Sequence, residues 1–180
     1  MNSLIPFSEV SYLFDDFEHT AWRLESRAGY ADDRQSDAYQ NFLRGEPAEE
    51  DLTHPYYAAR RRQAAEGKRF ERVRIVDTPA TEGQLYLLHR AQFNVSAGED
   101  IRNLHRSDAV RLDLPDADFW LFDSRTLVTF HFDAEDHILG VQVSQDPDEV
   151  VRACQIRDAA WHYAIRHTQF TAQILPVREH

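Results

Sequence analysis

Two short segments bring carboxylates and arginines together in a pattern that suits ligand binding or acid–base chemistry. Glu99–Arg102 reads Glu-Asp-Ile-Arg, and Asp118–Asp123 reads Asp-Phe-Trp-Leu-Phe-Asp. Each lies at the edge of an expected strand, where ligand crevices form in α/β sheets. Two interpretations stay open: a polar pocket for an anion, a metal or a basic partner, and a structural ion-pair network that closes the sheet. The candidate residues are Glu99, Asp100, Arg102, Arg106, Asp118 and Asp123.

Tryptophan next to arginine forms a second candidate site. Trp22 precedes Arg23, and Trp120 lies inside the second acidic segment. An exposed tryptophan beside an arginine suits a stacking surface for a base or a protein partner. The alternative is a core position, which we expect for Trp120 and Trp161, whereas both interpretations stay open for Trp22.

The nine histidines and the single cysteine form no metal-binding motif. His162 and His167 are five residues apart, and the sequence has no His-x-His or His-x-x-x-His. Cys154 falls on the apolar face of an expected helix, and a lone cysteine excludes an internal disulfide and a multi-cysteine zinc site. With six glycines and no Gly-rich phosphate loop, a nucleotide cradle is not expected. We therefore predict no metal and no cofactor.

Charge is unevenly distributed along the chain. The 180 residues carry 31 acidic and 20 basic side chains, a net charge of −11. Residues 1–54 hold 12 acids and 4 bases, whereas residues 60–76 hold 7 bases and 2 acids. The overall charge excludes a generally basic nucleic-acid coat, because phosphate binding depends on Lys and Arg. The basic band of Arg60, Arg61 and Arg62 suits phosphate, but we prefer a solvated helix face that pairs with the acidic first third.

The elements that must position these residues are helices followed by a β-α-β-β-β-α order. Thr78 before Pro79 and Asp146 before Pro147 are typical helix starts. The second expected helix starts at Asp33 or Ser36 and ends near Gly45. The periodicity predicts further helices over 8–17, 55–67, 78–98 and 146–167, and strands or extended pieces over 21–26, 70–76, 99–106, 110–114, 119–122, 127–132 and 138–143. The predicted fold class is α/β, with a mixed sheet flanked by helices and preceded by a helical N-terminal segment.

The length fits a single domain over 1–180. We divide it into an acidic N-terminal segment over 1–54, an α/β body over 68–167 and an extended or loose tail over 168–180. The sequence has no apolar run of 18 residues, and its first ten residues lack the features of a secretory signal. We therefore expect a cytoplasmic protein that does not act at a membrane.

Three segments together resemble a family of actinobacterial proteins with no assigned activity. They are Ala21–Arg27 with Tyr30, Ala97–Arg102 and Asp118–Ser124, and the resemblance covers residues from about 14 to 161. Members of that family are often encoded beside helix-turn-helix regulators. The resemblance therefore implies a regulatory setting.

The order of elements from the basic strand at 70–76 to the helix at Asp146 also resembles half of a phospholipase D-type domain. Active members of that group place His-x-Lys on the hairpin strand, where the histidine is a nucleophile. Here the corresponding strand reads Asp118-Phe119-Trp120. The resemblance thus implies the fold, together with a non-catalytic relative that is used for binding.

These observations predict a non-enzymatic regulatory or binding protein that acts with a protein partner, such as a helix-turn-helix transcription regulator. The acidic surface would engage the basic surface of that regulator. One alternative is a hydrolase or phosphodiesterase, which requires Glu99, Asp100, Asp118 and Asp123 around one open pocket with Arg102. A second alternative is nucleic-acid binding through the Arg60–Arg74 band with Trp22. Pairing of a free sheet edge would give a homodimer.

Overall fold

In the computed structural model, which describes residues 3–174, seven strands form one mixed sheet in the order β6-β5-β4-β1-β2-β3-β7. β1, β2 and β3 run parallel to one another, and the remaining neighbours are antiparallel. β1 comes from the acidic first part of the chain and lies in the middle of the sheet. The strands are β1 (Thr20–Glu25), β2 (Arg69–Val76), β3 (Asp100–His105), β4 (Phe119–Phe122), β5 (Thr126–Phe132), β6 (Ile138–Ser144) and β7 (Ile165–Arg166).

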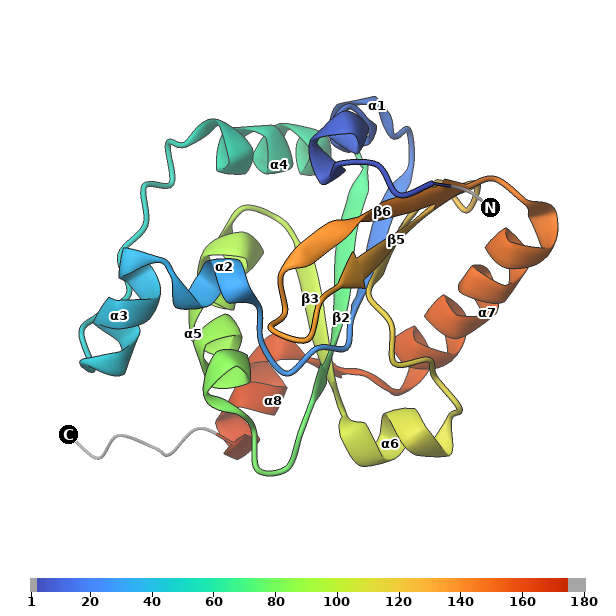
Figure 1. Cartoon of the computed structure of the whole chain (residues 1–180). Helices are drawn as coiled ribbons and strands as arrows, with labels where there is room; N and C mark the ends of the chain where they lie inside the picture. The colour runs from blue at the N-terminus through green and yellow to red at the C-terminus, as the bar shows by residue number, and fades with distance from the viewer. Residues whose placement is uncertain (1–2, 175–180) are drawn as a thin grey trace.

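Helices cover both faces of this sheet, so the predicted fold class is confirmed (Figure 1). α6 and α7 pack on one face, and the N-terminal helices pack with α4 and α5 on the other. Within the described residues, no helix is long and apolar enough to cross a membrane. The helices are η1 (a 3-10 helix, Phe7–Val10), α1 (Leu13–Asp16), α2 (Ala31–Arg34), α3 (Asp37–Leu43), α4 (Pro55–Ala65), α5 (Glu82–Ser96), α6 (Arg106–Arg111), α7 (Pro147–Tyr163) and α8 (His167–Ile174).

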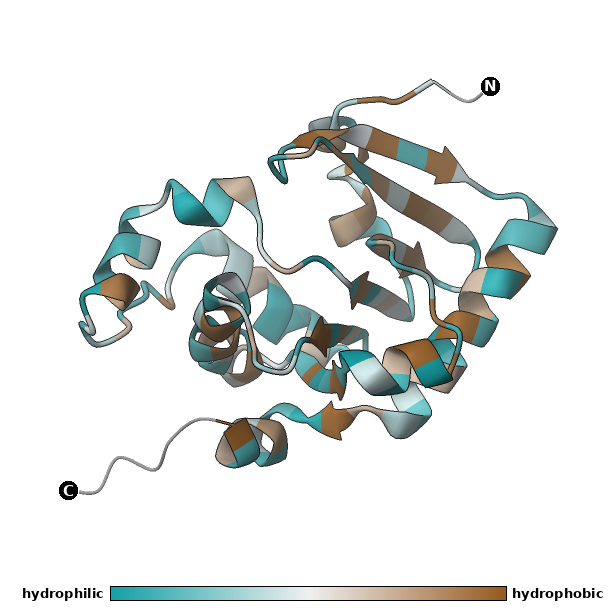
Figure 2. Ribbon diagram, turned by 60° about the horizontal axis from the view of Figure 1, so that its bottom comes forward, coloured by the Kyte–Doolittle hydropathy of each residue, from teal (hydrophilic) through white to brown (hydrophobic). Residues whose placement is uncertain are grey.

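The strands of the sheet centre have one apolar and one charged face, because successive side chains of a strand point to opposite sides. The face under α6 and α7, here called the apolar face, buries Trp22, Leu24, Val73, Ile75, Phe119 and Leu121. On the opposite side, the charged face, Arg23 of β1 lies beside Arg72 of β2, and Glu25 lies beside Arg74. Figure 2 shows the alternation of apolar and polar residues along the strands.

Capping side chains explain where the long helices begin. Asp146 caps α7 as predicted, since its side chain accepts hydrogen bonds from the backbone N–H groups of Asp148 and Glu149. α5 begins after Thr81 and not at Thr78, because the side chains of Thr81 and Gln84 each accept a hydrogen bond from the other's backbone N–H group. The predicted start at Thr78 is therefore wrong by one helical turn.

The helix expected to start at Asp33 or Ser36 begins at Ser36, which caps α3, and α2 precedes it as a separate turn. Four other predicted elements differ from the structure. The helix expected over 8–17 is divided into η1 and α1. The segment 110–114 is not extended but contains the end of α6, and α7 ends at Tyr163 instead of 167. The segment after residue 168 forms α8, because Phe170 packs against Val76 and Leu88. Residues 175–180 of the expected tail lie outside the described residues.

Candidate functional site

A cavity of about 360 Å³ lies over the charged face of the sheet. Its walls combine aromatic rings with three guanidinium groups, a composition that suits a ligand with an apolar body and an anionic group. The N-terminal helices, α4 and the sheet all contribute to it. The lining residues are Phe7, Ser11, Phe14, Arg23, Tyr56, Arg60, Phe70, Arg72 and Trp120.

The N-terminal wall of the cavity is held in place by Phe14. Its ring packs edge-on against Trp120 and Phe122, with centroids 5.0 and 5.1 Å apart. Its backbone carbonyl accepts hydrogen bonds from Gln63 Nε2 at 2.8 Å and from Arg60 Nη2 at 3.3 Å. Ring packing and hydrogen bonds to α4 therefore fix this segment over the sheet.

Glu25 is the centre of a buried ion-pair network beneath the cavity. Its carboxylate accepts hydrogen bonds from Arg74 Nε at 2.6 Å and from Arg72 Nη1 at 2.8 Å, and Arg23 Nε lies 3.4 Å away. Burial alone would raise the pKa of Glu25, but the guanidinium groups of Arg74, Arg23 and Arg72 hold it well below its ordinary value. Glu25 is thus ionised and binds three arginines at once.

Glu99 lies at the side of the network near α4 and is fully paired. It accepts hydrogen bonds from Arg72 Nε at 2.9 Å, from Asn94 Nδ2 at 3.0 Å and from the Tyr56 hydroxyl. Burial raises the pKa of Tyr56 to about 12, so its hydroxyl stays protonated and keeps donating. Glu99 therefore serves to hold Tyr56 and Arg72 at the cavity wall.

Asp118 closes the opposite side of the network. Its carboxylate accepts hydrogen bonds from Ser26 N at 2.8 Å, from Arg23 Nη2 at 3.2 Å and from the Tyr30 hydroxyl. Burial raises the pKa of Asp118, while Arg23 and these donors oppose the shift. The donors occupy both oxygens, so this carboxylate positions Arg23 beside the cavity.

Arg60 differs from the other arginines of the site, because it has no ion pair with any carboxylate of residues 3–174. It is 4% exposed, and its guanidinium lies 4.2 Å from the centre of the Phe70 ring. Nη2 donates to the Phe14 carbonyl, but Nε and Nη1 are buried without a hydrogen-bond partner. Burial lowers the pKa of Arg60. Arg23, Arg72 and Arg74 each have a carboxylate within ion-pair distance, whereas Glu99 and Asp15 attract Arg60 only from farther away.

The six acidic and basic residues predicted to form one site do not meet in one pocket. Glu99 and Asp118 belong to the buried network, whereas Asp100, Arg102 and Asp123 line an open groove of about 830 Å³ at the amino ends of β1–β3.

In that groove, the Asp123 carboxylate accepts hydrogen bonds from the backbone N–H groups of residues 18–20 at 2.7–2.9 Å. Arg102 stacks over Trp161 at 3.7 Å. Arg106 lies at the other end of the strands, where it binds Asp77 and Ser26.

The two tryptophans of the second candidate site and the three arginines of the basic band lie in different environments. Trp22 is fully buried on the apolar face against Phe119, so it forms no exposed stacking surface with Arg23. Trp120 is buried as expected, yet it forms part of the cavity wall. Arg61 and Arg62 lie on the exposed face of α4. The prediction that all three arginines lie on a solvated helix face is therefore wrong for Arg60, because this side chain packs against Phe70.

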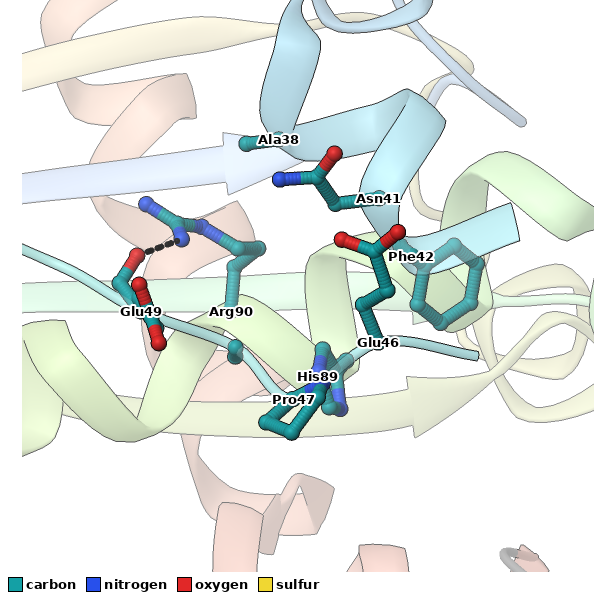
Figure 3. Close-up of a pocket in the computed structure, with 9 residues that line it drawn as sticks. Ala38, Asn41, Phe42, Glu46, Pro47, Glu49, His89 and Arg90 are labelled. Atoms are coloured by element: carbon teal, nitrogen blue, oxygen red, sulfur yellow. Dashed lines mark hydrogen bonds between the residues drawn. The ribbon is translucent and has the colours of Figure 1, made fainter. Parts of the chain in front are cut away.

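A second cavity, of about 250 Å³, lies between α3, the loop at 45–51 and α5 (Figure 3). Arg90 at its wall donates to the Glu49 carbonyl and forms an ion pair with Glu50, so the charge of this guanidinium is already compensated. Among the described residues, no group of three His, Cys, Asp or Glu side chains is placed to hold a metal ion. The cavity over the charged face is therefore the stronger candidate.

Glu25, Arg72, Arg74 and Tyr56 belong to this site, although they were not predicted as parts of it. A signal for the first three is present, since β1 and β2 place charged residues at every second position between apolar ones. Such a pattern in strands at the centre of a sheet indicates a buried charged face. Tyr56 gives no such signal, because its role depends on how α4 docks.

The chain belongs to the family described as the domain of unknown function DUF6879, which matches residues 8–172. Among curated proteins, none matches this sequence. Among solved structures, NucT from Helicobacter pylori is similar, with a TM-score of 0.50 and 8% sequence identity over 92% of this chain and 98% of NucT. NucT has a phospholipase D-like fold, so the likeness supports that part of the fold prediction. At this identity it concerns the fold alone.

Proposed function

We propose that this chain is a non-catalytic binding domain, which holds the anionic group of a small ligand in the cavity over the charged face. The observation that carries the proposal is the buried, unpaired guanidinium of Arg60 at the cavity wall. A buried charge without a partner is costly, whereas an anion would supply both the missing charge and acceptors for its N–H groups. Charge-assisted hydrogen bonds of this kind are the strong ones.

The dimensions and the walls of the cavity support the same proposal. About 360 Å³ falls within the usual range for small-molecule sites. The aromatic rings of Phe7, Phe14 and Trp120 offer apolar contact to the body of a ligand. Arginine supplies the charge, and the rings supply the apolar surface.

The pairing of the acidic groups supports binding over catalysis. A general acid or base must reach the substrate, but Glu99 and Asp118 are each held by an arginine and a tyrosine. The hydrolase alternative needs Asp100 and Asp123 in the same pocket, and these two line a different groove. The strand that carries His-x-Lys in active phospholipase D-type enzymes reads Asp118-Phe119-Trp120 here.

A protein partner with a basic surface, such as a helix-turn-helix regulator, is the second part of the proposal. Most acidic residues of the first 54 positions are exposed, which supports such an interaction. The exposed ones are Glu9, Asp15, Asp16, Glu18, Asp32, Asp37, Glu46, Glu49 and Asp51. Size-exclusion chromatography of the chain with a neighbouring helix-turn-helix protein tests this part. No complex at micromolar concentrations would reject it.

Nuclear magnetic resonance of the tryptophan indole N–H groups tests the binding proposal. Trp120 lines the cavity, and Trp22 on the apolar face is the internal control. Benzoate is the probe, and benzamide is its neutral counterpart. We expect benzoate to shift the Trp120 signal but not that of Trp22, and to bind at least tenfold more tightly than benzamide.

Two matched variants of α4 complete the test. Arg60→Met removes the buried guanidinium and keeps an unbranched apolar stem, so benzoate affinity should fall at least tenfold. Arg61→Met removes an exposed guanidinium from the next residue and should leave the affinity unchanged. Equal affinity of benzoate for the wild type and for Arg60→Met would overturn the proposal.

A further inference from the structure

We infer that the ligand of this cavity carries a single negative charge on an aromatic or similarly flat apolar body. The inference rests on the proposed function and narrows the class of ligand. The chemistry it names is a monoanionic group, either a carboxylate or a phosphodiester, in contrast to a phosphate monoester.

The arginines around the cavity differ in how they are paired. Arg23, Arg72 and Arg74 form ion pairs with three carboxylates, those of Glu25, Glu99 and Asp118. Tyr30 and Tyr56 stay neutral, because burial raises the pKa of both hydroxyls. Arg60 is the arginine of the cavity wall that, among the described residues, has no carboxylate within ion-pair distance, while Glu99 and Asp15 act on it only from farther away. A monoanion would therefore give Arg60 the close ion pair that the other arginines already have.

A dianion would instead bring one negative charge more than Arg60 can pair, because the other arginines of the site already have carboxylate partners. The second charge gains no ion pair of its own, and the ionised carboxylates of the network repel it. A phosphate monoester carries about −1.5 to −2 charges at neutral pH, since its second pKa is near 6. The site should thus discriminate between anions by their charge and not only by their shape.

Hydrogen-bond donors and aromatic rings at the cavity wall also limit the class of ligand. The indole Nε1 of Trp120 is buried and, among residues 3–174, has no acceptor. Arg60 adds Nε and Nη1, so three donors of these two wall residues are buried without a hydrogen-bond partner in the described part of the chain. The guanidinium groups of Arg23 and Arg72 lie 5.5 and 5.2 Å from the Trp120 ring. A ligand with acceptor oxygens would satisfy these donors, and a ligand with a flat apolar body would pack against the rings.

Four probes with related structures test the inference by the Trp120 indole shift. At pH 8, benzoate and methyl phenyl phosphate are monoanions, phenyl phosphate is a dianion, and acetate is a monoanion without a ring. We expect both aromatic monoanions to bind at least tenfold more tightly than phenyl phosphate. Acetate should bind at least tenfold more weakly than benzoate. The ratio of benzoate to methyl phenyl phosphate then separates the carboxylate from the phosphodiester.

Repeating the titrations at pH 5 separates the charge of the ligand from its size. Phenyl phosphate becomes a monoanion there, so its affinity should rise to within threefold of that of methyl phenyl phosphate. Benzoate stays ionised at both pH values and reports any change in the protein itself.

Tight, Arg60-dependent binding of phenyl phosphate at pH 8 would overturn this inference and leave the proposed function standing. If acetate bound as tightly as benzoate, the requirement for a flat apolar body would be wrong. If Arg60→Met left the affinity of every probe unchanged, the proposed function and the inference would both be wrong.

Discussion

The two faces of the central strands differ, although neighbouring residues of the same strands build them. Leu24 of β1 is fully buried among apolar side chains under α6 and α7, whereas Glu25, the next residue, is buried among three arginines. The apolar face gains stability from transfer of its side chains out of water. The charged face must offset the desolvation of its ions by close pairing, and such networks contribute little net stability.

This difference indicates where the function of the molecule lies. A sheet that needed only a core would use apolar residues on both faces. Here most charged side chains of the charged face form ion pairs, and Arg60, which has none within the described residues, lies beside a cavity. The predictions below test this contrast between a face that holds the fold together and a face that holds a ligand.

Glu25→Ala should have the largest effect on stability. It leaves Arg74, and partly Arg23 and Arg72, buried without their shared carboxylate, which costs about 3–5 kcal/mol in the free energy of unfolding. Urea unfolding measures the change. The matched control is Glu71→Ala on β2, whose partner Arg69 is exposed, and it should cost less than about 1 kcal/mol. Similar losses in both variants would contradict the special status of Glu25.

Leu24→Ala should follow with a loss of about 3 kcal/mol, because it opens a void in a closely packed core. The same urea experiment measures it, and the Trp120 indole shift reports ligand binding by the folded fraction. Benzoate affinity of that fraction should equal the wild-type value, because Leu24 lies on the other face. A large loss of affinity would show that the two faces are not independent.

His167 should make stability depend on pH. Burial lowers its pKa from 6.5 to about 4, so the folded protein favours the neutral ring. The contribution of His167 to the free energy of unfolding is fully present above pH 6.5. It is lost as the pH falls toward 4, a change of about 2–3 kcal/mol. His167→Gln removes this dependence.

Asp33 acts in the opposite direction over nearly the same range of pH. Burial raises its pKa to about 6, so its contribution to stability is lost as pH rises from about 4 to 6. The quantity to compare is therefore the difference between wild type and His167→Gln at each pH, from which Asp33 cancels. A difference that stays constant between pH 7 and pH 4 would contradict the assigned shift of His167.

The elements with strong local signals were predictable from the sequence, and those that depend on docking were not. Asp146 with Pro147 marks the start of α7, and the alternating segments give β2, β4, β5 and β6. α8 was missed, because it is stabilised by tertiary burial of Phe170 and not by a capping signal.

The site was predicted only in part for the same reason. The sequence points to Arg23, Arg60, Glu99, Asp118 and Trp120, which do surround or support the cavity. Asp100 directly follows Glu99 but lies on the other side of the sheet, because adjacent residues of a strand point in opposite directions. Spacing alone therefore grouped residues that the strand separates.

Arg60→Met should give a small change without ligand, and it is the one substitution expected to stabilise the protein. Replacing a buried charge that has no ion pair by an apolar side chain should raise the free energy of unfolding by about 1 kcal/mol. Urea unfolding checks the sign of the change. Arg61→Met on the exposed face of α4 should stay within about 0.5 kcal/mol of wild type.

The most direct test of the binding account is the free energy of unfolding of wild type and Arg60→Met, each measured with and without benzoate. At a benzoate concentration one hundred times the dissociation constant of the wild type, the wild type should gain about 2.7 kcal/mol. Arg60→Met should begin more stable and gain less than about 1 kcal/mol. A variant that begins less stable than wild type and gains as much from benzoate would contradict the account.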